Sequence, residues 1–348
     1  MCTAATYLTK DFYFGRNLDL HISYGERVTI TPRNYPFTFR NGLQLNHHYA
    51  MIGMATVEQG YPLYFDATNE KGLSLAGLNF PGNATYYEKD ERKDNIAPFE
   101  LIPWILGQCA TVEEARFKIR DLNLWNVQFN KEFPLSPLHW ILADRDQCLT
   151  LEATASGFKI YENPVGILTN NPPFDYHMYN LANYMNITAD IPKNRFSDKI
   201  DLTPYSLGMG GIGLPGDLSS ASRFVKAAFT KMNSRSGDTE SESISQFFHI
   251  LGSVAQQNGL TAVEGGHYEY TIYSSCCNTD QGIYYYTTYE NSQITGISMH
   301  NTDIDAKNLS VFIQDIIYFL ISGFVTFVFV LIMNSGESRF YILAGEAL

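Results

Sequence analysis

Cys2 directly follows the initiator methionine, so removal of Met1 would leave this cysteine with a free α-amino group. An α-amine has an ordinary pKa of about 7.7–8.0 and can therefore accept a proton near neutral pH. A thiol and a base would then lie on one residue, which is the arrangement that activates N-terminal nucleophiles. Taken alone, the Met1-Cys2 pair also fits the commoner case of a small buried cysteine without a catalytic role.

Two charged residues follow at a spacing that would bring them back beside the N-terminus. Residues 3–7 and 12–14 are strand-like and residues 9–11 look like a turn, so a hairpin is predicted. Arg16 and Asp19 come directly after its second strand. A cation close to a thiol raises the thiolate fraction, and a carboxylate could orient the α-amine. The alternative is an exposed Arg–Asp pair, which contributes about 0–1 kcal/mol and has no catalytic meaning.

Five further segments complete a pattern with Met-Cys-Thr at the N-terminus and Phe-Gly-Arg-Asn-Leu-Asp at residues 14–19. They are residues 69–73 (Asn-Glu-Lys-Gly-Leu), 76–81 (Ala-Gly-Leu-Asn-Phe-Pro), 168–172 (Leu-Thr-Asn-Asn-Pro), 208–224 and 282–286 (Gly-Ile-Tyr-Tyr-Tyr). In this order the motifs resemble the choloylglycine hydrolases, a family of cysteine N-terminal nucleophile hydrolases that includes bile salt hydrolases and penicillin V acylases. The resemblance covers residues 2–305 or so.

This resemblance implies an α+β fold, the four-layer αββα sandwich of two antiparallel sheets between helices. Cys2 would begin a strand of one sheet. The resemblance also implies a catalytic set, and all of its positions match in this chain: Cys2, Arg16, Asp19, Asn79, Asn170 and Arg223.

Amide hydrolysis needs a nucleophile, a group that accepts and later donates a proton, and donors for the tetrahedral oxyanion. Cys2 would supply the thiolate, and its α-amine would supply the base and later the acid. Asn79 and Asn170 are candidate oxyanion donors, because neutral amides do not quench a thiolate. Each follows a strand-like run and precedes a turn with proline, so simple turn chemistry is the alternative. For Arg223, at the start of a predicted helix, the alternative is an exposed arginine.

Penicillin V acylases typically carry Tyr at the position of Asn79, so the resemblance favours the bile salt hydrolases. The expected reaction is hydrolysis of the amide bond of glycine- or taurine-conjugated bile salts, without a cofactor or a metal. Apolar residues on loops near the motifs could form a wall for the steroid, or could belong to an ordinary core: Leu20, Tyr24, Phe65 and Phe129. Two alternatives stay open, cleavage of penicillin V or another N-acyl amide or lactone, and an inactive membrane-attached homologue.

Composition narrows the class of protein. The chain of 348 residues is long enough to bury most of its apolar surface. Its net charge of -12, without a cluster of Lys or Arg, makes nucleic acid an unexpected partner. The 5 cysteines show no CxxC spacing, which disfavours a metal site and a disulfide framework and fits reduced thiols in a cytosolic protein. Lys10 and Asp11 interrupt any apolar run near the start, so we expect no signal peptide and a cytoplasmic protein.

The hydrophobic pattern predicts sheets interrupted by helices. Strand-like runs fill the first 80 residues and return at 138–169, 267–275 and 283–299. Helices are predicted near residues 98–118, with Pro98 in a first turn and a capping box at Thr111 and Glu114. Two more are predicted at residues 219–232 and 240–254. Strands, then helices, then strands again indicate an α+β protein.

A glycine-rich run at residues 207–217 superficially resembles a phosphate-binding loop. It lacks the following Lys-Ser/Thr and a preceding apolar strand, so nucleotide binding is not expected. In bile salt hydrolases a similar run belongs to a protruding segment used in tetramer assembly. The resemblance therefore implies a homotetramer.

The C-terminus departs from the family pattern. Residues 316–336 carry no charged side chain and are long enough for a membrane span. We therefore divide the chain into a hydrolase domain, residues 2–310, and an atypical tail, residues 311–348. Three interpretations of the tail compete: a membrane anchor, a buried hairpin turning at Ser322 and Gly323, and a sequence altered by a frameshift or cloning error.

Overall fold

The predicted N-terminal hairpin forms and sets the position of Cys2. The computed structural model describes residues 1–312, 328–334 and 337–343 of the chain. β1 (Cys2–Leu8) and β2 (Phe12–Leu20) pair antiparallel, with Cys2 opposite Leu18. The sequence had suggested that residues 15–19 follow the second strand, but they lie within β2. The strand continues through them because their polar groups are buried and find partners there.

Gly15 lets β2 approach its other neighbour, β16 (Tyr268–Asn278), very closely. A Cβ on Gly15 would lie 2.0 Å from the carbonyl oxygen of Ser275, so any side chain would push the strands apart. The next residue, Arg16, donates its backbone N–H to Ser275 Oγ at 3.1 Å. The glycine of the motif therefore fixes the depth at which Arg16 is buried.

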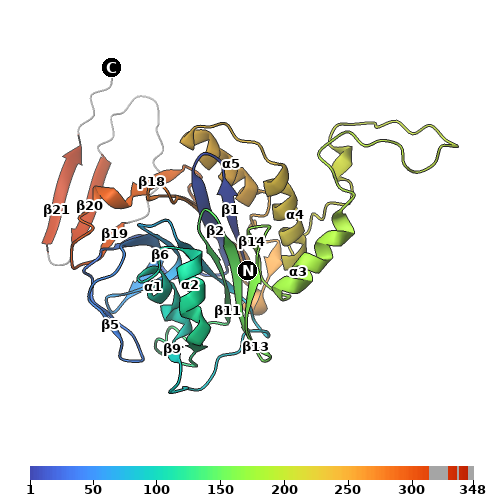
Figure 1. Ribbon diagram of the computed structural model, residues 1–348. Coiled ribbons are helices and arrows are strands. Elements are labelled where there is room, and N and C mark those ends of the chain that lie inside the picture. Colours follow the sequence, from blue (N-terminus) through green and yellow to red (C-terminus); the bar gives the residue numbers. More distant parts are fainter. Residues whose placement is uncertain (313–327, 335–336, 344–348) are drawn as a thin grey trace.

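Two antiparallel sheets make up most of the described chain (Figure 1). The sheet that contains the N-terminus has the order β14 (Ile167–Leu168), β1, β2, β16, β17 (Ile283–Thr288) and β18 (Thr295–Ser298), with β15 (Thr261–Ala262) beside β16. The other sheet has the order β13 (Gly157–Glu162), β12 (Cys148–Thr154), β11 (Leu138–Ala143), β8 (Ser74–Asn79), β7 (Tyr61–Asn69), β6 (Met51–Glu58), β3 (Arg27–Thr31) and β19 (Ser310–Phe312). Short pairs are β4 (Phe37–Thr38) with β5 (Gln44–Leu45) and β9 (Asp94–Ile96) with β10 (Leu122–Leu124).

The alternation of side chains along β11 shows why the second sheet is buried on both faces. Trp140 and Leu142 pack in a cluster with α1 (Leu101–Leu106) and α2 (Val112–Lys118). Ile141 and Ala143 belong to the other cluster, shared between the two sheets and the helices outside the first sheet. Neighbouring side chains of a strand point to opposite faces, so the sandwich has helices, two sheets and helices in that order. The predicted αββα fold is confirmed.

The helices start where the polar caps predict. Thr111 accepts a hydrogen bond from the Glu114 N–H at the start of α2, although the Glu114 side chain binds the Ala110 N–H instead of completing the box. On the other outer face lie α3 (Phe174–Leu181), α4 (Ser220–Asn233) and α5 (Glu240–Gly252). Ser219 caps α4, which places Arg223 in the first turn of that helix, next to β1.

A long arm between α3 and α4 projects from the body of the molecule (Figure 1). It includes the glycine-rich run, of which residues 209–211 form a single 3-10 turn. Large apolar side chains on the arm are strongly exposed: Phe196 at 82%, Tyr205 at 84% and Leu207 at 87%. Exposed apolar surface of this extent on a segment without a core of its own is typical of an interaction site.

At the C-terminus, β19 pairs with β3, so the expected boundary at residue 310 falls inside this strand. β20 (Val328–Asn334) pairs with β21 (Glu337–Leu343) in a hairpin. The predicted turn at Ser322 and Gly323 lies outside the described residues. Within the described ranges, no helix has the length and apolar character of a membrane span.

Candidate active site

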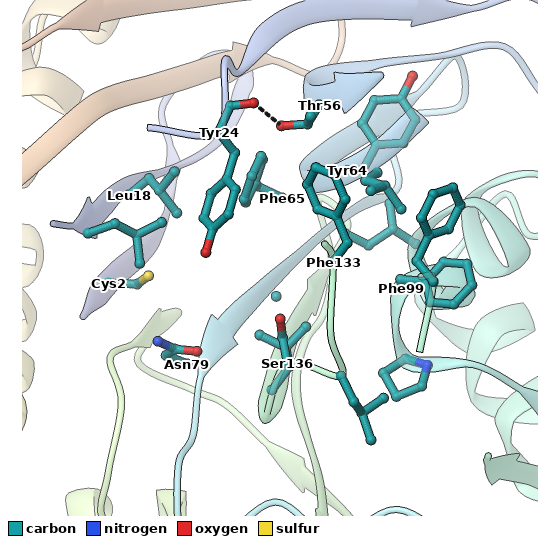
Figure 2. A pocket seen from close by; sticks show the side chains of 18 of the residues that line it. Cys2, Leu18, Tyr24, Thr56, Tyr64, Phe65, Asn79, Phe99, Phe133 and Ser136 are labelled. Atoms are coloured by element: carbon teal, nitrogen blue, oxygen red, sulfur yellow. Dashed lines mark hydrogen bonds between the residues drawn. The ribbon is translucent and has the colours of Figure 1, made fainter. Parts of the chain in front are cut away.

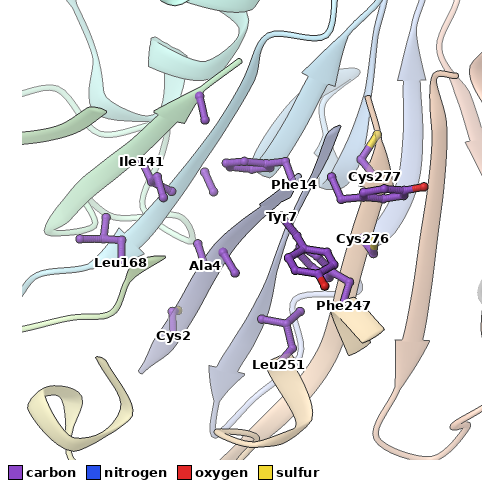
Figure 3. Close-up of a cluster of buried hydrophobic side chains, with 14 of the residues drawn as sticks. Cys2, Ala4, Tyr7, Phe14, Ile141, Leu168, Phe247, Leu251, Cys276 and Cys277 are labelled. Atoms are coloured by element: carbon purple, nitrogen blue, oxygen red, sulfur yellow. The ribbon is translucent and has the colours of Figure 1, made fainter. Parts of the chain in front are cut away.

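Cys2 lies at the boundary between the core and an open cleft. Its side chain is 2% exposed, and its sulfur faces the space between Leu18, Tyr24 and Asn79 (Figure 2). The following residues of β1 run into the core, where Ala4 is fully buried (Figure 3). The candidate nucleophile is thus held at the start of β1 while its sulfur remains within reach of a ligand.

Asn170 connects the backbone of Cys2 to the rest of the site. Its Oδ1 accepts hydrogen bonds from the Cys2 N–H at 2.8 Å and from Arg223 Nη2 at 2.7 Å. Its Nδ2 donates to the carbonyl oxygen of Asn79 at 2.7 Å. The oxygen of Asn170 therefore positions the nitrogen of Cys2, and only the second N–H of its amide is left for an oxyanion.

Arg223 is 1% exposed, so it is not the surface arginine that the helix position alone would suggest. Its guanidinium donates to the carbonyl oxygens of Cys2 at 2.5 Å and Leu218 at 3.0 Å, and to Thr3 Oγ1 at 2.6 Å. Burial lowers its pKa, and the charge of Asp19, 4.0 Å away, raises it part of the way back. Arg223 thus holds the first two residues of β1 in place.

Arg16 brings a second buried cation to the site. Its Nη1 donates to the carbonyl oxygens of Phe65 at 3.0 Å and of Gly77, and Nη2 has no partner within residues 1–312. Burial alone would lower the pKa of this guanidinium, but the negative groups around it, Cys2 foremost, outweigh burial and raise it. Arg16 and Cys2 both line the cleft, so a permanent positive charge lies in the same cleft as the Cys2 sulfur.

A buried carboxylate lies behind Arg16. Asp66 Oδ1 accepts from the hydroxyl of Tyr273 at 2.6 Å, and Oδ2 accepts from the hydroxyl of Tyr284 at 2.8 Å. Burial raises the pKa of Asp66, and Arg16 lowers it in return. Nothing in the sequence pattern singles out Asp66, because its partners come from strands more than 200 residues later.

Asp19 lies at the end of β2, next to the N-terminus. Its Oδ1 accepts from Thr271 Oγ1 at 2.7 Å and its Oδ2 from Gln256 Nε2 at 3.3 Å. Burial raises the pKa of this carboxyl, whereas Arg223 and the N-terminal ammonium lower it. The Asp19 carboxylate is therefore held by Thr271 and Gln256, close to the positive charges of Arg223 and the N-terminal ammonium.

Asn79 ends β8 with its side chain on the cleft. Its side chain lies close to the Cys2 sulfur (Figure 2), and within residues 1–312 no protein group binds its amide. A free amide beside the nucleophile is the arrangement that an oxyanion donor requires. The structure therefore brings all six predicted residues to one place.

All four predicted apolar residues line the cleft. Tyr24 and Phe129 lie on loops as predicted, whereas Leu20 and Phe65 lie on β2 and β7. Further apolar side chains complete the wall: Leu18, Phe99, Ile102, Phe133, Leu135, Leu138 and Trp140. Sequence reasoning missed these, because an aromatic residue on a loop and one in a core look alike before the loops are placed.

A family model described as linear amide C–N hydrolases, choloylglycine hydrolase family, matches residues 2–312. The chain belongs to the choloylglycine hydrolase family. It is accordingly a hydrolase of linear amide C–N bonds. The match begins at the candidate nucleophile and ends with β19.

Curated relatives of this hydrolase are similar over most of its length. A bile salt hydrolase/transferase of Lactiplantibacillus plantarum is 59% identical over 309 residues, which are 89% of this chain and 95% of the relative. A bile salt hydrolase/transferase of Clostridium perfringens is 36% identical over 318 residues, which are 90% of this chain and 96% of the relative.

Solved structures are also similar to this chain over most of its length. A variant of the conjugated bile acid hydrolase from Clostridium perfringens superposes with a TM-score of 0.84 at 34% identity, covering 92% of this chain and 100% of that chain. Penicillin V acylase from Agrobacterium tumefaciens superposes with a TM-score of 0.72 at 18% identity, covering 90% and 91%. The second likeness is one of fold alone.

The C-terminal tail has a separate similarity. A family model described as spore cortex protein YabQ matches residues 299–348. This match covers far less than half of the chain and does not show membership of that family. It takes in the apolar tail, which lies beyond the choloylglycine hydrolase match.

Two buried histidines support the Asn170 segment of this choloylglycine hydrolase. His177 donates from Nε2 to the carbonyl oxygen of Asn170 at 3.0 Å, and burial lowers its pKa to about 4. His139 donates from Nε2 to the carbonyl oxygen of Thr169 at 2.9 Å, and its Nδ1 lies 3.1 Å from Glu152 Oε1. Neither histidine touches the cleft, so they position Asn170 rather than react.

The other cysteines lie in different surroundings from Cys2. Burial raises the pKa of Cys109 to about 11 and the pKa values of Cys148 and Cys277 to about 12, and it also raises the pKa of Cys276 well above its ordinary value. None of the four lines the cleft. Thiols of this kind stay protonated and unreactive near neutral pH. Within the part of the chain that the structure describes, no group of three or more His, Cys, Asp or Glu side chains could hold a metal.

Proposed function

We propose that, after removal of Met1, this enzyme hydrolyses the amide bond of glycine- or taurine-conjugated bile salts. The observation that carries the proposal is the position of Cys2. Its sulfur faces a large apolar cleft, while its nitrogen is held by Asn170 beside two buried arginines. The names of the relatives from Lactiplantibacillus plantarum and Clostridium perfringens support the same substrate class.

In the first half-reaction, the Cys2 thiolate attacks the carbonyl carbon of the substrate amide. The positive charge of Arg16 favours the thiolate, and the free amide of Asn79, with the second N–H of Asn170, receives the oxyanion. The α-amine of Cys2, held on Asn170 Oδ1, has taken up the proton of the thiol, and as an ammonium it gives that proton to the leaving nitrogen as the C–N bond breaks. The acyl group is then joined to Cys2 as a thioester.

In the second half-reaction, water attacks the thioester. The α-amine of Cys2 takes a proton from that water, and the thiolate leaves as the free bile acid forms. Arg223 and Asp19 act through position: Arg223 holds the carbonyl of Cys2, and Asp19 lies beside the N-terminus with its own donors.

The steroid would occupy the apolar cleft, and its size sets the substrate preference. A steroid buries far more apolar area than the phenoxy group of penicillin V, and burial stabilises by about 25 cal/mol per Å². Asn79, in place of the Tyr that is typical of penicillin V acylases, supports the same choice.

The test uses protein whose N-terminus has been verified by intact mass and N-terminal sequencing. We expect kcat/KM for glycocholate or taurocholate to exceed that for penicillin V at least about tenfold, by the burial argument above. Correctly processed Cys2→Ser should fold but lose amide hydrolysis, because a hydroxyl is a far weaker nucleophile with the same amine. A preference for penicillin V would overturn the substrate, and full turnover by Cys2→Ser would overturn the mechanism.

We further propose that the enzyme is a cytoplasmic homotetramer assembled through the arm between α3 and α4. The exposed apolar side chains of that arm support this assembly. Light scattering on the intact protein should give four times the chain mass, and Phe196→Ser with Leu207→Ser should lower that mass. A monomer of unaltered protein would contradict the proposal, and cell fractionation tests the location.

A further inference from the structure

The unprocessed chain holds its own ammonium group in a site made of two oxygens. The nitrogen of Met1 donates to Glu269 Oε2 at 2.6 Å and to the carbonyl oxygen of Asp19 at 2.6 Å. Glu269 is 13% exposed and lies near the start of β16. At these distances, the carboxylate and the carbonyl accept two of the three hydrogen bonds that an ammonium group can donate.

This site lies within reach of the catalytic nitrogen. Nitrogens of successive residues are separated by three covalent bonds and so lie roughly 2.8–3.6 Å apart. The place of the Met1 nitrogen is therefore at hydrogen-bond distance from the nitrogen of Cys2. Once Met1 is removed, a nitrogen in that place could receive the proton of the Cys2 α-amine.

The site also lies apart from the apolar cleft, because Glu269 is not among the residues that line the cleft. The acyl part of the substrate and the amine part must lie on different sides of the scissile bond. Two residues along β16, Thr271 binds the carboxylate of Asp19. Side chains two apart on a strand share a face, so Glu269 and the support of Asp19 face the same end of the site.

We propose that Glu269 and the carbonyl of Asp19 form the amine subsite of this enzyme, which binds the ammonium of the amino acid that hydrolysis releases. The inference rests on the proposed amide hydrolysis at Cys2. When the C–N bond breaks, the leaving nitrogen takes one proton from the Cys2 α-ammonium and becomes a neutral amine. A second proton from water makes it an ammonium, the usual form of an aliphatic amine at neutral pH. Met1, while present, fills the subsite and blocks it.

Product inhibition tests the subsite with a matched pair of ligands. Taurine carries the ammonium, and isethionate replaces it with a hydroxyl on the same two-carbon sulfonate. With processed enzyme and glycocholate as substrate, we expect taurine to inhibit at least about tenfold more tightly, because hydrogen bonds to charged groups are the stronger class. In Glu269→Gln this preference should fall close to one, and in Glu269→Asp it should be intermediate. The control Glu264→Gln, an exposed carboxylate on the turn before β16, should keep the preference.

Equal inhibition by taurine and isethionate in the unaltered enzyme would overturn the subsite, whether or not any variant folds. So would a preference that Glu269→Gln retains. If Glu269 instead binds the α-amine of Cys2 itself, Glu269→Gln will shift the pH profile of kcat and leave the ratio of the two inhibitors unchanged, which also contradicts the proposal. Absence of glycocholate hydrolysis by processed enzyme would be the separate failure of the proposed function.

Discussion

Replacement of Asn170 by alanine separates a positioning role from a substrate-binding role. The side chain makes three hydrogen bonds, to the Cys2 N–H, to Arg223 and to the carbonyl of Asn79, at 2.7–2.8 Å. Asn170→Ala removes all three. It leaves the nitrogen of Cys2 without the acceptor that orients it and Arg223 with one buried donor unpaired.

The size of the effect follows from these bonds. The bond to Arg223 is charge-assisted and contributes about 1.5–3 kcal/mol, and the two neutral bonds contribute about 1 kcal/mol each, so the free energy of unfolding should fall by roughly 3.5–5 kcal/mol. For catalysis, loss of the oriented amine and of an oxyanion donor should lower kcat by about 10²–10³. KM should change little, because the oriented amine and the oxyanion donor act on the reacting atoms in the transition state and not on the steroid.

Asn163 is a matched control for this experiment. It is also buried and makes three side-chain hydrogen bonds, with Thr150 at 3.1 Å, Ile167 at 3.0 Å and Gly166 at 2.8 Å. Asn163→Ala should lower the stability by roughly 3 kcal/mol but leave the kcat of folded enzyme unchanged. Steady-state kinetics on glycocholate and urea unfolding of both variants give the comparison. A pure KM effect in Asn170→Ala, or an equal loss of kcat in Asn163→Ala, would refute the reasoning.

Three further predictions concern other parts of the molecule. Asn79→Ala should lower kcat by about 10²–10³ with little change in KM; a pure KM effect in steady-state kinetics would reassign Asn79 to substrate binding. His177 is neutral when folded, with a pKa of about 4 against an ordinary 6.5, so the stability that its burial contributes is present above pH 6.5 and is lost as the pH falls toward 4. The stability lost in His177→Gln, measured by urea unfolding, should therefore shrink by roughly 2 kcal/mol between pH 7.5 and pH 5, and a pH-independent difference would contradict this. Truncation after Phe312 should keep activity and raise solubility, whereas truncation after Leu309 removes β19 from the sheet and should lower the melting temperature; equal melting temperatures would show that β19 does not contribute.

The sequence alone pointed to the candidate nucleophile and to most of the elements that hold it. A cysteine after the initiator methionine, alternating residues on either side of a short turn, and threonine or serine before apolar helical runs are local signals. They act between neighbours along the chain. For the same reason the hairpin, the Thr111 cap of α2 and an α+β class could be predicted before any contact was known, whereas the αββα order came from the resemblance to the choloylglycine hydrolases.

Only the tertiary structure decided where each polar residue of the site lies and what it contacts. From its position in the helix alone, Arg223 would be a surface arginine. It is buried because α4 packs against β1, a strand that lies more than 200 residues earlier in the sequence. Asn170 reads as an oxyanion donor, yet its oxygen holds the nitrogen of Cys2. His139 and Glu269 had no signal at all. The free energy of a buried charge or amide depends on which partners replace water around it, and distant strands supply those partners.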